Sequence, residues 1–361
     1  MVNQTGTLWK NTNGRIEQFR QARMGFEAMT RRLSQATLNT YLDYVDANGD
    51  PRKFSPSSAT SPFVPDHYAR QSELRFISGP GLAGNTSSQP PRPTQAVFFQ
   101  APLGFVTDGN AADTANYSGL ENLLNTWGYY IEFNSDSNQG LNLDGSGLNL
   151  KPAFVKATDR YRFRLMELMQ ASERMSLYKY TASNPGLKSS DVNGMNWFTD
   201  ALPPLPQNMR PPTTWSHVLA ENIVALVVLP KLSLGDQATG GYTDGSLAPN
   251  YSYDSTLSGT GSSDPNLNSK TQLPPLLTVT MVAVDEASFK RFQGTSTTVP
   301  TTLALDSLFQ MTGSTKDATT PGFAKDLQTL GQTLQANKIN YRVFTTDVSI
   351  KGAKWSRGQN K

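Results

Sequence analysis

The chain contains 361 residues, of which 37% are hydrophobic and 17% charged, with two histidines and no cysteine. This length can bury the core of one large domain or two ordinary ones, and the missing cysteines exclude disulfide scaffolds, thiolate zinc sites and cysteine nucleophiles. The net charge of +3 is too small to indicate a nucleic-acid partner. Frequent glycine and proline, 28 and 23 residues, favour a sheet-bearing core with long polar loops.

The first predicted element is a long amphipathic helix. Its apolar or small side chains are three or four residues apart and therefore share one face, a stripe made of Ile16, Phe19, Ala22, Phe26, Met29, Leu33, Ala36, Thr40 and Tyr44. We expect the helix to begin near Thr7 and to end near Asp43, a length of about 55 Å at 1.5 Å per residue. Its first two turns offer only Leu8 and Trp9 to a core, so they are expected to project beyond the folded body.

A loop rich in proline and serine follows this helix. Asp46, Asn48 and Asp50 alternate there as they would at the start of a calcium-binding loop. The later glycine and the distal glutamate of such a loop are missing, so a turn is the better interpretation and no metal site is assigned.

Strands dominate the rest of the chain, with short helices between them. Short apolar or alternating runs bounded by turn residues predict strands at 73–79, 95–102, 128–134, 159–170, 221–233, at the start of 273–292, and at 340–350. Helices are expected at 117–127, at the end of 273–292 and at 323–339, and a helix is the competing interpretation of 159–170. Residues 134–150 and 234–272 are long polar loops. No β-α-β unit of uniform size recurs, so we expect an α+β fold with the long helix packed on an antiparallel sheet.

Few residues suggest catalysis. His67 reads as a loop residue and His217 as a packed or capping residue before a strand; a nucleophile could use either as a base, but no G-x-S-x-G motif is present. The glycine-rich stretch 79–84 has no lysine and no helix pattern after it, so it is not a phosphate loop. Asp285 and Glu286 are the pair of carboxylates to test for a hydrolase, although acids are common at helix N-termini.

A second alternative is a surface carbohydrate-binding or adhesive module. It would use aromatic side chains of the connecting segments as a platform for sugars. The candidate aromatic residues are Trp127, Trp197, Trp215, Tyr242, Tyr251 and Tyr253.

The helix and the strands, taken in order, resemble a known family. The segment "LWKNTNGRIEQFRQARMGFEAMTRRLSQATLNTYLDY" is similar to the part that follows the transmembrane stretch in J-type minor pseudopilins of type II secretion, closest to the Verru_Chthon cassette protein C family. The resemblance continues through "SELRFISGPG", "AVFFQAPLGF", "YSGLENLLNTWGYYIEF", "RFRLMELMQ", "HVLAENIVALVVLPKLS" and "LPPLLTVTMVAVDEASFKRF", and so covers most of the chain.

This resemblance implies a pilin-like α+β fold and a structural role. In that family the helix continues upstream as an apolar membrane segment with a prepilin motif, and Met1 lies where that apolar half should end. The resemblance implies a periplasmic head anchored to the inner membrane of a bacterial envelope, contacts with other minor pseudopilins through the helix, and exported substrates at the outer loops. It carries over no catalytic, cofactor-binding or metal residues.

The chain is therefore expected to have three parts. Residues 1–45 form the helix, residues 46–350 the globular head, and residues 351–361 a basic tail. Phe19, Phe26, Met29 and Leu33 should hold the helix on the head. The expected function is that of a pseudopilin-like structural subunit, which is not an enzyme and needs no cofactor.

Overall fold

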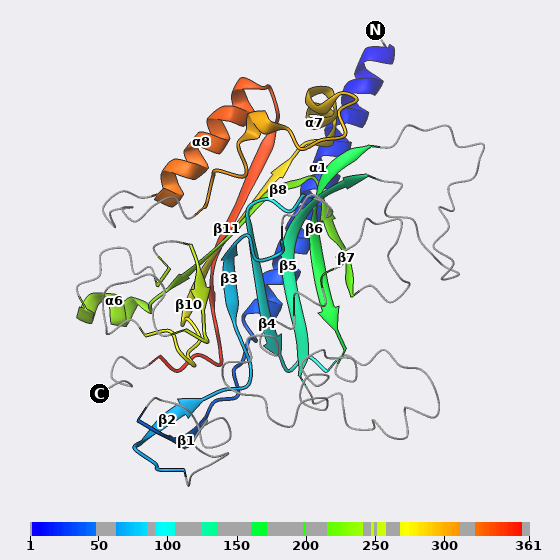
Figure 1. Ribbon diagram of the computed structural model, residues 1–361. Coiled ribbons are helices and arrows are strands. Elements are labelled where there is room, and N and C mark those ends of the chain that lie inside the picture. Colours follow the sequence, from blue (N-terminus) through cyan, green and yellow to red (C-terminus); the bar gives the residue numbers. More distant parts are fainter. Residues whose placement is uncertain are drawn as a thin grey trace, which may run out of the picture.

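The structure is a computed structural model of the chain (Figure 1). It describes residues 2–47, 63–84, 91–104, 124–135, 160–171, 198, 202, 215–240, 247–248, 251–257, 268–310 and 322–355. Within the first helix, side chains are described from Glu17 onward.

The N-terminal helix α1 (Val2–Leu33) ends earlier than expected. The prediction that it would reach Asp43 is wrong. The backbone N–H of Thr37 already donates to the carbonyl of Gln100, at 2.9 Å, in an isolated bridge to the sheet. Strand β1 (Tyr41–Val45) follows, because β-branched and aromatic residues there favour extended backbone over helix.

The strands form three sheets, in which all pairs are antiparallel. The largest has the order β7-β6-β5-β4-β3-β9, the second the order β11-β10-β8, and the third is a hairpin of β1 and β2. The strand bounds are β2 (His67–Gln71), β3 (Ile77–Pro80), β4 (Gln95–Ala101), β5 (Asn125–Ser135), β6 (Tyr161–Gln170), β7 (Ser216–Glu221), β8 (Ile223–Lys231), β9 (Tyr253–Asp254), β10 (Leu276–Val284) and β11 (Tyr341–Ser349).

The predicted pilin-like α+β fold, with a long helix on one antiparallel sheet, is wrong. The described part of the chain contains eleven strands in three sheets and only four α-helices, so the architecture is predominantly β. The physical reason lies in β8 and β10, whose side chains are buried on both faces almost throughout. A single helix covers only one face of a sheet, so the other face of these strands must be covered by a second sheet. The predicted fold, with one sheet and one helix, has no such second layer.

The two larger sheets are joined by side chains as well as by an apolar core. Residues of β4, β5, β8 and β10 share one hydrophobic cluster with the C-terminal half of α1. Thr94 Oγ1 accepts from the backbone N–H of Leu226 at 3.2 Å, and Gln95 Oε1 accepts from that of Val228 at 2.8 Å. The outer edge of β8 is therefore bonded to the start of β4.

Several strand predictions are confirmed and one helix prediction is corrected. The segment 159–170 forms β6, so its interpretation as a helix is wrong. The segment 117–127 was predicted to be helical, but β5 already begins at Asn125, and residues 117–123 lie outside the described residues. Within the predicted loop 234–272, the structure forms a short helix and β9.

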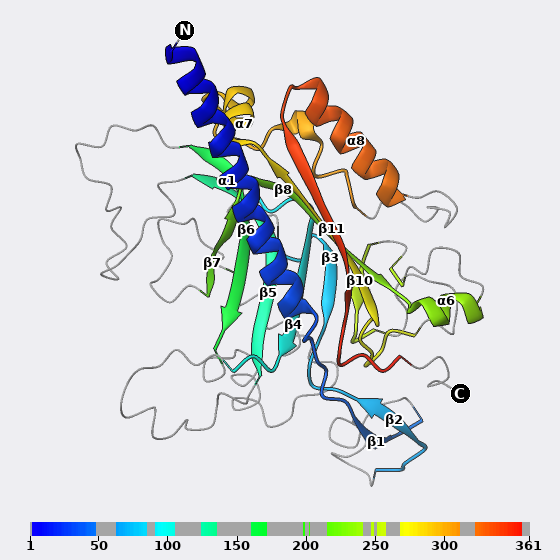
Figure 2. The same ribbon diagram turned by 180° about the vertical axis from the view of Figure 1, so that it is seen from behind.

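Short helices complete the molecule. They are α6 (Leu234–Gly240), α7 (Glu286–Gln293), the 3-10 helix η6 (Thr301–Leu303) and α8 (Gly322–Ala336). The views from the front and from behind agree that α1 runs along the sheets and extends past α7, while the β1-β2 hairpin protrudes at the opposite end (Figures 1 and 2). In the described part of the chain, α1 and the β1-β2 hairpin therefore project at opposite ends.

Candidate functional site

One face of α1 is fixed to both large sheets. Phe26, Met29 and Leu33 are buried, and Phe19 is partly buried with the Arg342 guanidinium 5.3 Å from its ring centre. These are the residues that were expected to hold the helix. At Gly25 the helix lies so close to β7 that an added Cβ would be 3.2 Å from Ala220 Cβ. This contact is tighter than most Cβ contacts, so a side chain at this position would require α1 or β7 to shift by a few tenths of an ångström.

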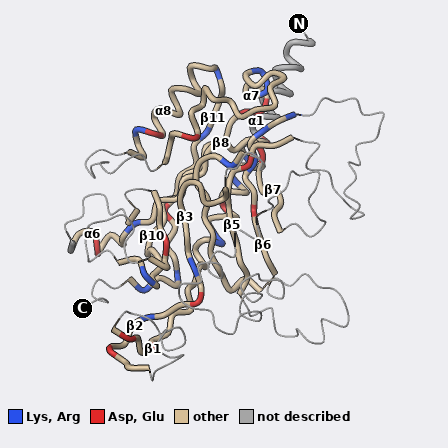
Figure 3. The backbone as a smooth tube through the Cα atoms, viewed as in Figure 1, with Lys and Arg blue, Asp and Glu red and all other residues tan. Residues whose placement is uncertain are grey.

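Polar contacts fix α1 near its exit from the body. Gln18 and Glu286 bind each other twice: the Gln18 amide donates to Glu286 Oε2 at 2.9 Å, and the Glu286 backbone N–H donates to Gln18 Oε1 at 3.1 Å. Arg160 and Arg162 approach the same carboxylate at 2.9 and 3.3 Å. Basic and acidic residues accordingly lie side by side where β6 meets α7 (Figure 3).

The carboxylates proposed as a catalytic pair have structural partners. Asp285 is buried and caps α7, because its Oδ2 accepts from the backbone N–H of Ser288 at 2.9 Å. Glu286 is engaged by α1 and by two arginines. The two side chains thus serve a helix N-terminus and an inter-element ion cluster.

A second polar cluster lies at the C-terminal end of α1. Glu167, which is buried in β6, forms an ion pair with Arg32, accepts from the Tyr129 hydroxyl at 2.9 Å, and lies 3.0 Å from His217 Nε2. Arg32 also stacks over Trp127, with its guanidinium 4.5 Å from the ring centre. Burial, and then the Glu167 charge, raise the pKa of Tyr129 well above its ordinary value of 10. The cluster ties α1 to three strands of the six-stranded sheet.

Sequence reasoning did not find this cluster. It interpreted His217 as a packed or capping residue and gave Glu167 no role. A signal was nevertheless present, because Phe163, Leu165 and Glu167 alternate along one face of β6. A charged residue that continues an apolar face needs a buried partner, and a basic residue on the predicted helix could supply it.

The opposite face of α1 is open to solvent. Its exposed residues are Glu17, Arg20, Gln21, Arg23, Met24, Glu27 and Arg31. Arg23 Nε and Glu27 Oε1 are paired at 2.8 Å across one turn. Met24 is half exposed, at 51%, and is a single large apolar side chain on a face that is otherwise polar or charged. This face is the candidate interaction surface of the helix.

The two histidines lie in different sheets. His67 is on the β1-β2 hairpin and pairs with its neighbour Asp66 at 2.7 Å, with both side chains about half exposed. His217 is on β7 and pairs with Glu167. The fold therefore gives each histidine its own carboxylate and does not combine them into one site.

Most described aromatic candidates for a sugar platform are buried. Trp127, Tyr251 and Tyr253 have at most 3% of their surface exposed, and Trp215 is partly buried. Trp197 and Tyr242 lie outside the described residues, as do Asn48 and Asp50 of the calcium-like stretch. Asp46 is buried at the end of β1. Among the described residues, no group of three or more His, Asp or Glu could bind a metal ion.

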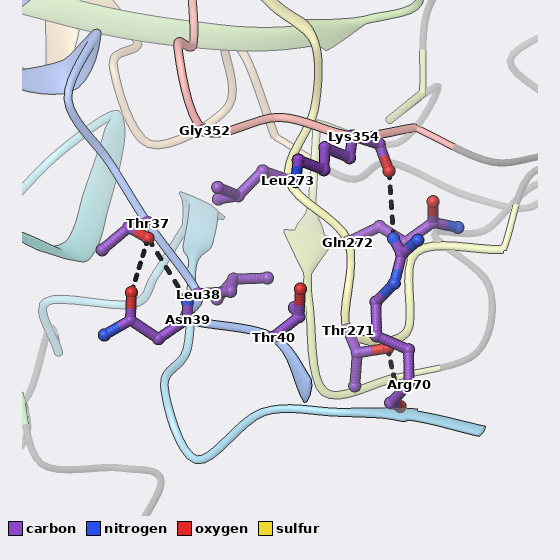
Figure 4. A pocket seen from close by; sticks show the side chains of 10 residues that line it. All are labelled: Thr37, Leu38, Asn39, Thr40, Arg70, Thr271, Gln272, Leu273, Gly352 and Lys354. Atoms are coloured by element: carbon purple, nitrogen blue, oxygen red, sulfur yellow. Dashed lines mark hydrogen bonds between the residues drawn. The ribbon is translucent and has the colours of Figure 1, made fainter. Parts of the chain in front are cut away.

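A pocket of about 220 Å³ lies beside the β1-β2 hairpin (Figure 4). It is formed where four segments meet: the segment between α1 and β1, strand β2, the stretch before β10 and the C-terminal segment. Its lining residues are Thr37, Leu38, Asn39, Thr40, Arg70, Thr271, Gln272, Leu273, Gly352 and Lys354. Arg70 Nη1 donates to the Lys354 carbonyl at 3.0 Å and so connects two of the walls.

None of the helices in the described part is both long and apolar enough to span a lipid bilayer. Comparison with known protein families, curated proteins and solved structures found no match.

Proposed function

We propose that this protein is a structural subunit of a pseudopilin-type assembly in the bacterial cell envelope, related to type II secretion or to type IV pili. It acts through protein contacts and catalyses no reaction. The proposal rests on α1 and on the ordered resemblance of the chain to minor pseudopilins. It does not rest on the fold, which is predominantly β.

The observation that carries the proposal is the unequal use of the two faces of α1. One face is held by buried apolar residues and by two polar clusters, centred on Glu167 and Glu286. The other face is exposed, and the N-terminal turns extend beyond the body (Figure 2). A helix anchored so firmly along one side can transmit force from neighbouring subunits to the head, and its free face can pack against their helices.

In this proposal the head lies in the periplasm, and the helix contacts other minor pseudopilins near the inner membrane. Exported substrates would meet the head at its outer loops. Two of the aromatic residues considered for a carbohydrate-binding module, Tyr251 and Tyr253, are buried and give this alternative no support. Exposed tyrosines of the β1-β2 hairpin, such as Tyr68, are the described aromatic residues that it could use.

The absence of cysteine permits a direct test by crosslinking in cells. A Met24→Cys variant places one thiol on the exposed face of α1, and a Leu234→Cys variant places one on α6, where the side chain is 76% exposed. A reagent with a maleimide at one end and a diazirine at the other forms a thioether with the introduced thiol and, on illumination, loses N2 and inserts into a bond of a nearby residue. We expect this treatment of intact cells to link the Met24→Cys protein to an envelope subunit with a long N-terminal helix, identified by mass spectrometry. The Leu234→Cys protein should not give this product.

The proposal fails if the Met24→Cys protein gives the same products as the Leu234→Cys control, or if the protein fractionates entirely away from the envelope. A glycan array serves as the test of the alternative. Specific binding that is lost in a Tyr68→Ala variant, which removes an exposed aromatic ring of the hairpin, would favour the module over the subunit.

A further inference from the structure

The pocket beside the hairpin has walls that are fixed to one another. Thr271 Oγ1 donates to the Arg70 carbonyl at 3.1 Å, and the Tyr253 hydroxyl donates to the Gln272 carbonyl at 3.0 Å. On the other side, the Lys351 N–H donates to the Ser34 carbonyl at 2.9 Å, which holds the C-terminal segment against the end of α1. Hydrogen bonds between distant segments thus maintain the space that the pocket occupies.

Two lining residues adopt backbone conformations that side chains rarely favour. Asn39 has a φ of 44° and Thr271 a φ of 56°, both in the left-handed region. For threonine, which is branched at Cβ, this conformation is costly. Contacts at the pocket wall, such as the hydrogen bond from Thr271 Oγ1 to the Arg70 carbonyl, therefore hold the backbone of Thr271 in this conformation.

The lining is cationic and polar. Arg70 and Lys354 bring two positive charges, and none of the described residues that line the pocket is an aspartate or glutamate. Figure 4 shows the Arg70 side chain rising from β2 toward the C-terminal segment, on which the Lys354 side chain lies near Leu273. Hydroxyl and amide groups of the remaining wall come from Thr37, Asn39, Thr40, Thr271 and Gln272. Partial burial lowers the pKa of Arg70, but a guanidinium stays protonated at neutral pH.

The volume limits what can enter. Pockets for drug-sized ligands measure about 300–1,000 Å³, whereas this one measures about 220 Å³. It can take a molecule of roughly monosaccharide size or smaller. Two cations among neutral polar groups favour an occupant with several acceptor oxygens and a negative charge, because charge-assisted hydrogen bonds are about twice as strong as neutral ones.

We infer that this pocket binds a small oxyanion, that is, a carboxylate, sulfate or phosphate carried by a molecule of that size. The Arg70 guanidinium and the Lys354 ammonium would bind the anionic oxygens. The threonine and amide side chains would bind the neutral remainder. Such a site lies at the end of the molecule opposite the projecting turns of α1, so both can be occupied at once (Figure 1).

The test is calorimetry on the full chain with four probes at constant ionic strength: inorganic phosphate, sulfate, glucuronate and glucose. We expect saturable binding of at least one of the three anions and none of glucose. The variants Arg70→Gln and Lys354→Gln should each weaken that binding about tenfold or more, since each removes a charged hydrogen-bond donor. Lys290→Gln, which removes an exposed charge on α7, is the matched control and should bind as the native protein does.

The identity of the bound probe separates the carboxylate, sulfate and phosphate sources. Because Arg70 also supports the C-terminal segment, the melting temperature of the Arg70→Gln variant is measured first. If that temperature differs from the native one, Lys354→Gln is the variant that tests the inference, since the Lys354 side chain is exposed. The inference is wrong if none of the three anions binds, if glucose binds as tightly as the best of the anions, or if Lys354→Gln and Lys290→Gln bind alike.

Discussion

Helix α1 and the β1-β2 hairpin protrude from opposite ends of the molecule, but they are attached in different ways. The helix buries Phe26, Met29 and Leu33, and a buried carboxylate, Glu167, binds its last turn. The hairpin leaves large apolar residues in solvent instead. These exposed residues are Tyr41, Leu42, Tyr44 and Tyr68, and Val64 lies just before the second strand.

The difference shows how the same chemistry has different effects in different surroundings. Both regions contain a leucine, a tyrosine beside an acidic residue, and a histidine paired with a carboxylate. In the α1 anchor these groups are mostly withdrawn from water, so each contact contributes to stability. In the hairpin they are solvated, so similar contacts contribute little. Three matched substitutions test this comparison.

The largest expected effect is that of Leu33→Ala. Leu33 is completely buried in the main core, so the substitution should lower the free energy of unfolding by about 2–5 kcal/mol. Leu42→Ala, at a position that is 67% exposed in the hairpin, should change it by less than about 0.5 kcal/mol. Urea unfolding followed by circular dichroism measures both. Equal losses would mean that the hairpin is as well anchored as the helix.

The next effect is that of Glu167→Gln, which keeps the shape of the side chain but removes its charge. It should cost about 2–3 kcal/mol, because Arg32 and His217 lose a charged partner and the Tyr129 hydroxyl loses a strong acceptor. Asp66→Asn breaks the exposed pair with His67 and should cost at most about 1 kcal/mol. The same unfolding experiment compares them, and a larger loss for Asp66→Asn would overturn the assigned role of Glu167.

The smallest effect concerns alkaline pH. Burial keeps Tyr129 protonated above pH 10, whereas in the unfolded chain it ionises there, so the unfolded state binds fewer protons and stability falls as pH rises. One such tyrosine contributes about 1.4 kcal/mol per pH unit between about pH 10 and its folded pKa. The Tyr129→Phe substitution should reduce the slope of the free energy of unfolding against pH by that amount above pH 10. Below pH 9, the effect of the substitution on this free energy should not vary with pH.

Tyr68→Phe is the control for this experiment. A side-chain hydrogen bond with Tyr44 raises the pKa of Tyr68 as well, but the group is on the surface of the hairpin. We expect its variant to show nearly the native slope when the urea midpoint is measured from pH 9 to pH 12. A larger change for Tyr68→Phe than for Tyr129→Phe would contradict the picture of a rigid anchor and a solvated hairpin.

Local patterns in the sequence identified most elements but not their grouping into sheets. The alternation in 159–170 predicted β6, and the β-branched run in 221–233 predicted β8. The same patterns could not reveal that the strands divide between two large sheets. That division depends on contacts such as Thr94 with Leu226, which are 132 residues apart in the chain.

The end of α1 and the pocket were missed for related reasons. The helical periodicity continues to Tyr44, but Thr37 finds a partner in Gln100 and the chain leaves the helix. The apolar stripe predicts a helix but gives no sign of the tertiary contact that ends it. The pocket is lined by residues of four segments that are far apart in the chain, so no spacing along the sequence could have indicated it. From the sequence, the position of Glu167 on an apolar face indicates only that a cation must lie beside it, and not which residue provides that cation.

The hydrogen bonds from the edge of β8 to Thr94 and Gln95 have a consequence for folding. An unpaired strand edge is a template on which another chain can add a strand, and β8 is among the most apolar segments of the protein. Thr94 and Gln95 accept from two of its backbone N–H groups, those of Leu226 and Val228, only after the beginning of β4 has docked. Until then, a partly folded molecule exposes a strand that other copies can bind. We therefore expect aggregation during refolding to depend on how fast β4 reaches β8.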